Sequence, residues 1–346
     1  MRWMTYGLFA ILFSSASATM ASEKDGRLDI YFIDVEGGAA TLIASPGGQS
    51  ILVDSGYPDN NGRDLNRILH VVRDVAELKH LDHAVVTHWH LDHFGNHASL
   101  AGSIPITQFW DRGIPDMLEE DKEFPDRIAK YRAACNNSSK VLKAGDQHDL
   151  PTPKGPLSVQ VVTGSRKVIA NTGKPNPFAA EHKPQPVDPS DNSASLSIVM
   201  QFGKFRFLCC GDLTWNVEAE LVTPNNPLGH IDLFMVTHHG LNVSNNPIFV
   251  KAIDPTVSVM CNGPTKGGAT ETIQTLRACK SLQAMYQLHR NVNLSAEAQA
   301  PKECIANDEP TVNCAGRWIK ASVAGDGGTF TVQIGKEGEP RTFRCE

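Results

Sequence analysis

A cluster of metal-ligand side chains directly after a short apolar run constrains the fold of this chain more than any other feature. Ala84–Thr87 is typical of a β-strand and leads into His88-Trp89-His90-Leu91-Asp92-His93. Side chains at i and i+2 lie on the same side of an extended segment, so His88 and His90 can converge on one metal ion. Asp92 and His93 follow in a turn and can face a second ion. Four such side chains so close together favour a two-metal centre over the alternative, a solvated polar loop.

Two later apolar runs also end in residues that can bind metal. Phe207–Cys210 leads into Gly211-Asp212, and a carboxylate at a strand end can bridge two metal ions. The alternative for Asp212 is a helix N-cap, because a helix is expected directly after it. Phe234–Val236 leads into Thr237-His238-His239-Gly240, where one histidine should complete the second metal site. Taken alone, such a pair could also be two ordinary loop histidines.

The remaining pattern predicts an α/β sandwich of two sheets with helices outside. β-rich runs predict strands at Leu28–Val35, Ala40–Ala44, Ser50–Asp54, Ala84–Thr87, Ile106–Trp110, Ser195–Phe202, Phe205–Cys210, Ile231–Val236, Thr256–Asn262, Trp318–Val323 and Thr329–Ile334. The first three should form a meander, and Ser195–Phe202 and Phe205–Cys210 a hairpin. Helices are expected at Asp64–Leu78, near Asp126–Cys135, at Asn216–Leu221 and at Glu271–Ser281. Residues 163–192, rich in Pro, Asn, Lys and Gly, should form a long loop.

Charge and the N-terminal residues limit the partners and the location of the protein. The net charge of −6, without a long basic run, disfavours stable binding of nucleic acid. Arg2 and the apolar Tyr6–Phe13 predict a secretory signal peptide over residues 1–21, in preference to an uncleaved anchor. No later apolar run reaches the roughly 18 residues of a membrane span. We therefore expect one secreted or periplasmic domain over residues 22–346, without membrane association.

The cysteines support an exported protein. Eight cysteines follow the predicted signal peptide, and an even count in an exported chain suggests disulfide bonds. Cys304 and Cys314 flank a polar loop and could close it. Cys209 and Cys210 would point to opposite faces of a strand, so they cannot easily pair with each other.

The three strand ends that carry ligands resemble the metal motifs of the metallo-β-lactamase superfamily. Val53-Asp54-Ser55-Gly56 resembles the short signature of that superfamily before its first helix. More narrowly, the chain resembles the hydrolase domain of DNA-internalisation competence proteins and the secreted phosphorylcholine esterases. That narrower resemblance rests on Ile33–Ala40, on Asp191–Leu196, and on His239-Gly240 with Ser244 four residues on.

The resemblance implies a four-layer αβ/βα sandwich with two metal ions at one edge, between the sheets. It also implies that His88 and His90 bind the first ion, that Asp92 and His93 bind the second, and that Asp212 bridges them. His239 would close the second site. His238 would contact an anionic oxygen of the substrate or exchange roles with His239.

One departure from the superfamily pattern concerns the first metal ion. Many members carry a further histidine before the bridging aspartate, whereas this chain has Asp191-Asn192-Ser193 there and His182 only in the Pro-rich loop. The first ion would then have an oxygen ligand or an open position. Asp111, at the end of the Ile106–Trp110 strand, could supply that oxygen, or it could equally be a turn residue. The departure argues against a β-lactamase or a thioester hydrolase of the usual kind.

These features together predict an exported phosphodiesterase. Two close metal ions lower the pKa of a bridging water, and the resulting hydroxide can attack a phosphodiester whose charge the ions neutralise. Asp92 and His238 would be catalytic, and Asn192 and Ser244 would contact a small-molecule or phosphodiester substrate. A mixed His and Asp ligand set suits zinc and manganese alike. The alternatives are a lactone or carboxyl-ester hydrolase and a non-catalytic metal-binding module.

Overall fold

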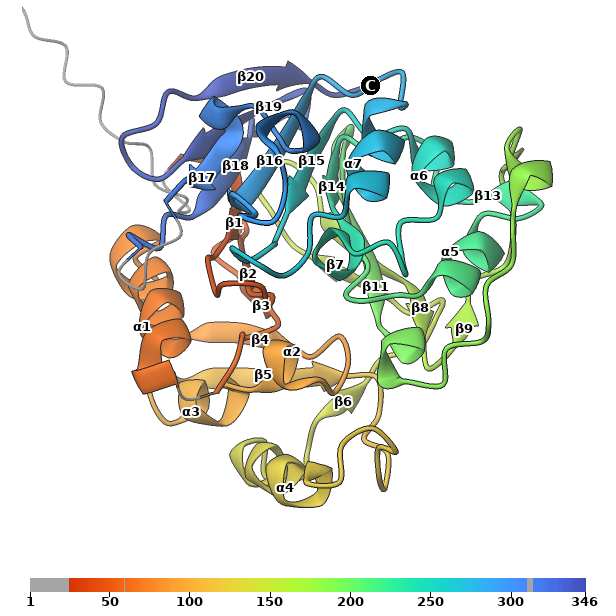
Figure 1. The fold of residues 1–346 in the computed structure, drawn as a ribbon. Coiled ribbons are helices and arrows are strands. Elements are labelled where there is room, and N and C mark those ends of the chain that lie inside the picture. Colours follow the sequence, from red (N-terminus) through yellow and green to blue (C-terminus); the bar gives the residue numbers. More distant parts are fainter. Residues whose placement is uncertain (1–24, 59, 310–313) are drawn as a thin grey trace, which may run out of the picture.

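The computed structural model describes residues 25–58, 60–309 and 314–346 of the chain. The predicted signal peptide, residues 1–21, lies outside the described residues. Two mixed β-sheets pack face to face and helices cover their outer faces, so the predicted α/β sandwich is confirmed (Figure 1). Within the described residues, no helix has the length and apolar character needed to cross a membrane.

The first sheet has the strand order β20-β19-β18-β1-β2-β3-β4-β5-β6. Its strands are β1 (Leu28–Phe32), β2 (Thr41–Ala44), β3 (Ser50–Val53), β4 (Leu81–Val85), β5 (Ile106–Asp111), β6 (Lys140–Val141), β18 (Ile319–Val323), β19 (Thr329–Ile334) and β20 (Arg341–Arg344). β1, β2 and β3 are antiparallel neighbours, which confirms the predicted meander. β3, β4 and β5 run parallel, so their carboxyl ends meet at one edge of the sheet.

The second sheet has the order β17-β16-β15-β14-β12-β11-β8-β7, with β9 beside β8. Its strands are β7 (Gln147–Leu150), β8 (Leu157–Gly164), β9 (Lys167–Val168), β11 (Ser197–Phe202), β12 (Phe205–Cys209), β14 (Leu233–Met235), β15 (Val257–Met260), β16 (Ala284–His289) and β17 (Ile305–Asn307). The predicted hairpin is confirmed as β11 and β12. β12, β14, β15 and β16 run parallel, so this sheet also brings its carboxyl ends to one edge.

Residues 163–192 contain short elements where the sequence predicted one long loop. They include the end of β8, the strand β9, the strand β10 (Lys174–Pro175) and the 3-10 turns Ala179–Glu181 and Asp191–Ala194. β10 pairs with β13 (Asn225–Asn226), which ties this segment to the rest of the molecule.

The helices form the two outer layers. They are α1 (Arg63–His70), α2 (Leu91–Phe94), α3 (His97–Ala101), α4 (Phe124–Ala134), α5 (Trp215–Leu221), α6 (Pro247–Ile253) and α7 (Thr270–Arg277). Ile68 of α1 packs with Tyr31 and Leu42 on the outer face of the first sheet. The predicted helix Asp64–Leu78 is shorter than expected, because the α-helix ends at His70 and continues as a π-helical turn to Val75.

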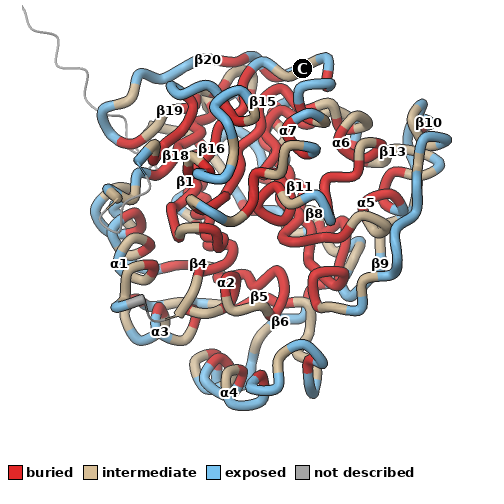
Figure 2. The backbone as a smooth tube through the Cα atoms, in the orientation of Figure 1, coloured by how far each residue is buried: buried red, intermediate tan, exposed pale blue. Residues whose placement is uncertain are grey.

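Apolar side chains from both sheets fill the space between them. Ile30, Phe32 and Ile43 of the first sheet belong to the same buried cluster as Phe207 of the second. The rings of Phe32 and Phe207 meet edge to face across the two sheets, with centroids 5.9 Å apart. Figure 2 shows the central strands of both sheets buried, whereas outer loops, helix faces and edge strands such as β10 and β20 are exposed. This packing fixes the two sheets against each other and thus the relative positions of their carboxyl ends.

All eight cysteines are free in the structure, so the expected disulfide bonds do not form. The proposed closure between Cys304 and Cys314 is absent too. Cys209, Cys210 and Cys261 belong to the same buried apolar cluster as Phe32 and Phe207. There they pack as small hydrophobic side chains. Burial raises the pKa of the Cys209 thiol to about 12, which keeps it protonated.

Candidate metal centre

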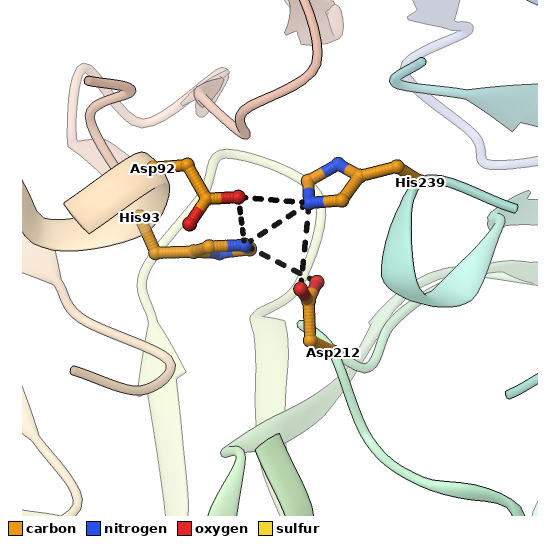
Figure 3. Close-up of side chains that lie close together, drawn as sticks. All are labelled: Asp92, His93, Asp212 and His239. Atoms are coloured by element: carbon orange, nitrogen blue, oxygen red, sulfur yellow. Dashed lines mark hydrogen bonds and ion pairs between the residues drawn. The ribbon is translucent and has the colours of Figure 1, made fainter. Parts of the chain in front are cut away.

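Four buried side chains from three different strand ends meet at one point. Asp92 and His93 lie on α2 beyond β4, Asp212 follows β12, and His239 follows β14. Each of the four offers one ligand atom, and these atoms all lie within 4.8 Å of one another. Figure 3 shows the two carboxylates and the two imidazoles pointing at a common centre. The parallel strands of both sheets therefore bring these side chains together.

The distances in this four-residue cluster are short. His93 Nε2 lies 3.2 Å from Asp212 Oδ1, and His239 Nε2 lies 3.4 Å from Asp212 Oδ2. His239 Nε2 is also 3.2 Å from Asp92 Oδ2. Two imidazole nitrogens and two carboxylate oxygens in a buried place are the donor set that zinc, manganese or iron prefers. The residues present therefore fit a divalent metal ion.

A second pair of imidazoles lies beside this cluster. His88 Nε2 is 3.2 Å from His90 Nδ1 and 3.9 Å from Asp212 Oδ2. Asp212, a member of the cluster, therefore also faces His88, as a bridging carboxylate would have to do. The pair of His88 and His90 offers fewer metal-ligand atoms than the four-residue cluster does. The two halves of the centre, one at the pair and one at the cluster, therefore differ in their number of ligands.

Unusual backbone conformations aim these side chains inward. His238 and His239 both have a φ of 54°, in the left-handed region that non-glycine residues rarely adopt. The His238 N–H donates to the Gly211 carbonyl at 3.0 Å, which ties this turn to the one before Asp212. Gly211 also has a φ of 54°, and a Cβ there would lie 2.9 Å from the Thr87 side chain. Strained turns held by surrounding structure are common at functional sites.

Further groups fix the orientation of the imidazoles. Asp54 Oδ2 lies 2.7 Å from His93 Nδ1, and Asp54 also accepts hydrogen bonds from the backbone and hydroxyl of Thr87. His239 Nδ1 lies 3.0 Å from the Cys261 carbonyl, which can only accept, so this nitrogen carries the proton. In both rings the Nε2 atom then faces the cluster as a potential ligand.

Charge coupling within the cluster is strong. Burial alone would lower the pKa of His93, but the carboxylates of Asp212, Asp54 and Asp92 outweigh it and raise that pKa well above the usual value. Burial would raise the pKa of Asp212, but His238, His93 and His239 hold it well below the usual range. Asp212 is therefore an anion at neutral pH, as a metal ligand must be.

The predicted substrate residues gather around His238. Its Nε2 lies 3.3 Å from Asp212 Oδ2 and 3.4 Å from Asn192 Nδ2. Its Nδ1 lies 3.0 Å from Ser244 Oγ. The structure thus brings His238, Asn192 and Ser244 together at the edge of the centre, although they come from distant parts of the sequence.

Asp111 is the predicted site residue that the structure does not bring to the centre. One of its carboxylate oxygens accepts a hydrogen bond from the Gly113 N–H at 2.8 Å, and the other accepts from the Tyr131 hydroxyl at 2.9 Å. Both oxygens are engaged away from His88 and His90. The geometry favours the turn role for Asp111 over that of a metal ligand.

Three residues at the centre were not anticipated from the sequence. Lys266 contacts the Asp92 carboxylate, and its Nζ lies 3.1 Å from the Tyr57 hydroxyl. Glu120 Oε1 lies 3.3 Å from His90 Nε2 and accepts the Asp191 N–H at 2.7 Å. Lys266 lies in Gly263-Pro264-Thr265-Lys266-Gly267-Gly268, a glycine-rich loop after a strand, which was a usable signal. Glu120 and Tyr57 carried no local signal.

Comparison with known proteins assigns the family. The sequence profile described as "Metallo-beta-lactamase superfamily" matches residues 33–263. The chain belongs to this superfamily. The narrower likeness to competence proteins or phosphorylcholine esterases has no support from the comparisons, and no curated protein sequence matches the chain.

Several solved structures are similar to parts of the chain at low sequence identity. The metallo-beta-lactamase fold protein YhfI from Bacillus subtilis is 11% identical, covering 75% of this chain and 95% of its own, with a TM-score of 0.42. CmlA, a diiron beta-hydroxylase from Streptomyces venezuelae, is 15% identical, covering 74% and 47%, with a TM-score of 0.37. Rubredoxin oxygen:oxidoreductase from Desulfovibrio gigas is 16% identical, covering 54% and 39%, with a TM-score of 0.31. This superfamily chain spans about half or less of the latter two.

Proposed function

We propose that this superfamily member is an exported metal-dependent phosphodiesterase. The observation that carries the proposal is the buried cluster of Asp92, His93, Asp212 and His239, with His88 and His90 beside it. Such a donor set, delivered by strand ends of both sheets, suits a centre of two divalent ions, zinc or manganese. An intact set of ligands also speaks against a non-catalytic module.

The roles of the residues follow from their places. Two divalent ions, when bound, lower the pKa of a coordinated water and neutralise charge on substrate oxygens. His88 and His90 would hold one ion, Asp92, His93 and His239 the other, and Asp212 both. Asp54 keeps the His93 ring in the orientation that leaves Nε2 free to bind. His238, supported by Ser244, would stabilise charge or move a proton at the substrate.

A phosphodiester suits the polar groups beside the ligands better than a neutral ester does. Asn192 Nδ2 and His238 Nε2 lie next to each other and beside Asp212. With its proton on Nε2, His238 is one donor and the Asn192 amide nitrogen is another, so the two can bind two oxygens of one tetrahedral phosphate, whereas an ester offers a single carbonyl oxygen.

Export is the part of the proposal that rests on sequence alone. Arg2 and the apolar Tyr6–Phe13 support a cleaved signal peptide. Expression of the full chain followed by N-terminal sequencing of the mature protein tests it. Cleavage near residue 21 is expected, and a protein retained in the cytoplasm with its N-terminus intact would contradict it.

A substrate panel tests the reaction. The purified, metal-loaded protein is incubated with bis-p-nitrophenyl phosphate, with p-nitrophenyl acetate and with a simple lactone. Turnover of the phosphodiester is expected, with loss of that activity in Asp212→Asn but not in Asp149→Asn, an aspartate exposed on β7. Turnover of the esters without the phosphodiester would overturn the proposal, and metal binding without any turnover would favour the non-catalytic module.

A further inference from the structure

One lysine enters the metal centre from the loop after β15. Lys266 Nζ forms an ion pair with the Asp92 carboxylate and donates a hydrogen bond to the Tyr57 hydroxyl oxygen, 3.1 Å away. The same ammonium lies 5.4 Å from the centroid of the Tyr57 ring, within cation–π range. A third of the Lys266 side chain is exposed.

The stem of Lys266 is held in place by close backbone packing. The Gly263 N–H donates to the Lys266 carbonyl at 2.9 Å, which closes the loop into a tight turn. Gly37 lies against the stem, and a Cβ on that glycine would be 3.2 Å from the Lys266 Cβ. The φ of Gly37 is 94°, so the chain needs glycine there to pass the lysine closely. The ammonium is thus directed to the centre by two separate loops.

The charge of this lysine calls for an anionic partner. Lys266 Nζ pairs with the Asp92 carboxylate, and a lysine ammonium is a cation at neutral pH. A divalent ion bound by Asp92 would compete for the charge that Lys266 now neutralises. The positive charge of Lys266 would then be largely unneutralised, and the metal centre beside it would itself be cationic.

We propose that Lys266 is a substrate-binding residue that contacts an anionic oxygen of the substrate, with Tyr57 positioning its ammonium. This inference rests on the proposed function and narrows it to negatively charged substrates such as phosphodiesters. A neutral lactone or ester carries no negative charge that would neutralise the Lys266 ammonium. The competing explanation is structural: Lys266 would only hold Asp92 in place for metal binding.

Anion binding separates the two explanations. Inorganic phosphate and dimethyl phosphate are titrated by calorimetry into the metal-loaded wild type and into Lys266→Gln, Lys266→Arg and Tyr57→Phe. Lys302→Gln, which changes the same charge at an exposed lysine, is the matched control. We expect Lys266→Gln to bind both anions about 10- to 100-fold more weakly, the loss typical of a hydrogen bond between charged groups. Lys266→Arg should recover part of this affinity, and Tyr57→Phe should lose a few-fold.

Metal content and kinetics complete the test. Lys266→Gln should keep the metal content of the wild type and should raise KM for bis-p-nitrophenyl phosphate much more than for the neutral p-nitrophenyl acetate. Anion affinity within twofold of the wild type, or loss of metal from Lys266→Gln, would overturn the inference. If the wild type binds phosphate through Lys266 but hydrolyses no phosphodiester, the proposed function fails while the anion site stands.

Discussion

The carboxylate of Asp54 should control metal affinity although it is not itself among the cluster ligands. Asp54 Oδ2 lies 2.7 Å from His93 Nδ1, and the backbone and hydroxyl of Thr87 donate to the same carboxylate. Asp54→Asn keeps the shape of the side chain but removes the charge that holds the His93 proton on Nδ1. Partners of this kind typically contribute about 10- to 100-fold to metal affinity. At about 1.4 kcal/mol for each factor of ten, this corresponds to roughly 1.4–3 kcal/mol.

A competition titration against a chelator of known affinity measures this loss. Asp54→Asn should release zinc or manganese at a chelator concentration about 10- to 100-fold lower than the wild type does. Asp149→Asn, at an exposed position on β7, should titrate like the wild type. Because Asp54 is buried, thermal unfolding of the metal-free variant shows whether the fold survives. A folded Asp54→Asn with wild-type metal affinity would refute the argument that Asp54 orients His93.

Three other changes have outcomes that follow from the structure. Burial raises the pKa of Glu218 from 4.5 to about 7, so its stabilising effect is complete below pH 4.5 and is lost as the pH rises through 7. Urea unfolding of the metal-free protein should therefore show a loss of about 2.5 kcal/mol between pH 5 and 8 that Glu218→Gln lacks, and equal pH profiles would contradict this. Glu120→Gln should weaken the binding of one metal ion by about tenfold, seen in a metal titration, because Glu120 orients His90 Nε2; two unchanged ions would exclude that role. Phe207→Ala should cost about 3–5 kcal/mol of unfolding free energy, because its fully buried ring contacts Phe32 across the sheets; a cost below about 1 kcal/mol would show that this contact does not hold the sheets together.

The strands that carry the ligands could be predicted because their signals are local. Each is a mostly apolar run followed within a few residues by a potential metal ligand, as Phe205–Cys209 is by Asp212. The strand β16 (Ala284–His289) was not predicted from the sequence. All six of its residues are buried, yet two of them, Gln287 and His289, are polar. Gln287 accepts the Ala300 N–H at 2.6 Å and His289 Nε2 lies 2.6 Å from Asp34 Oδ1, so each side chain pairs with a distant partner. A pattern of apolar and polar residues cannot show such compensation.

The residues of the candidate metal centre also divide into those that a local sequence pattern predicts and those that distant contacts bring in. The run His88–His93 predicts its own convergence, because spacing along one short segment decides which side chains share a face. Asp111 illustrates the opposite case, since the hydroxyl of Tyr131, twenty positions on, engages one of its oxygens. Lys266 reaches Asp92 from a loop 174 residues away. Only the packing of the two sheets brings such groups together, so the sequence could name candidate ligands but not the charges around them.

The most direct test of this account is the metal content of the purified protein. The chain is purified without chelator, dialysed against buffer free of added metal, and analysed for zinc, manganese and iron per chain. The account predicts bound divalent metal in the wild type, approaching two ions per chain after loading, and its loss in Asp212→Ala, since Asp212 contacts both halves of the centre. A wild type that takes up no divalent metal, or a folded Asp212→Ala that keeps the full content, would contradict it.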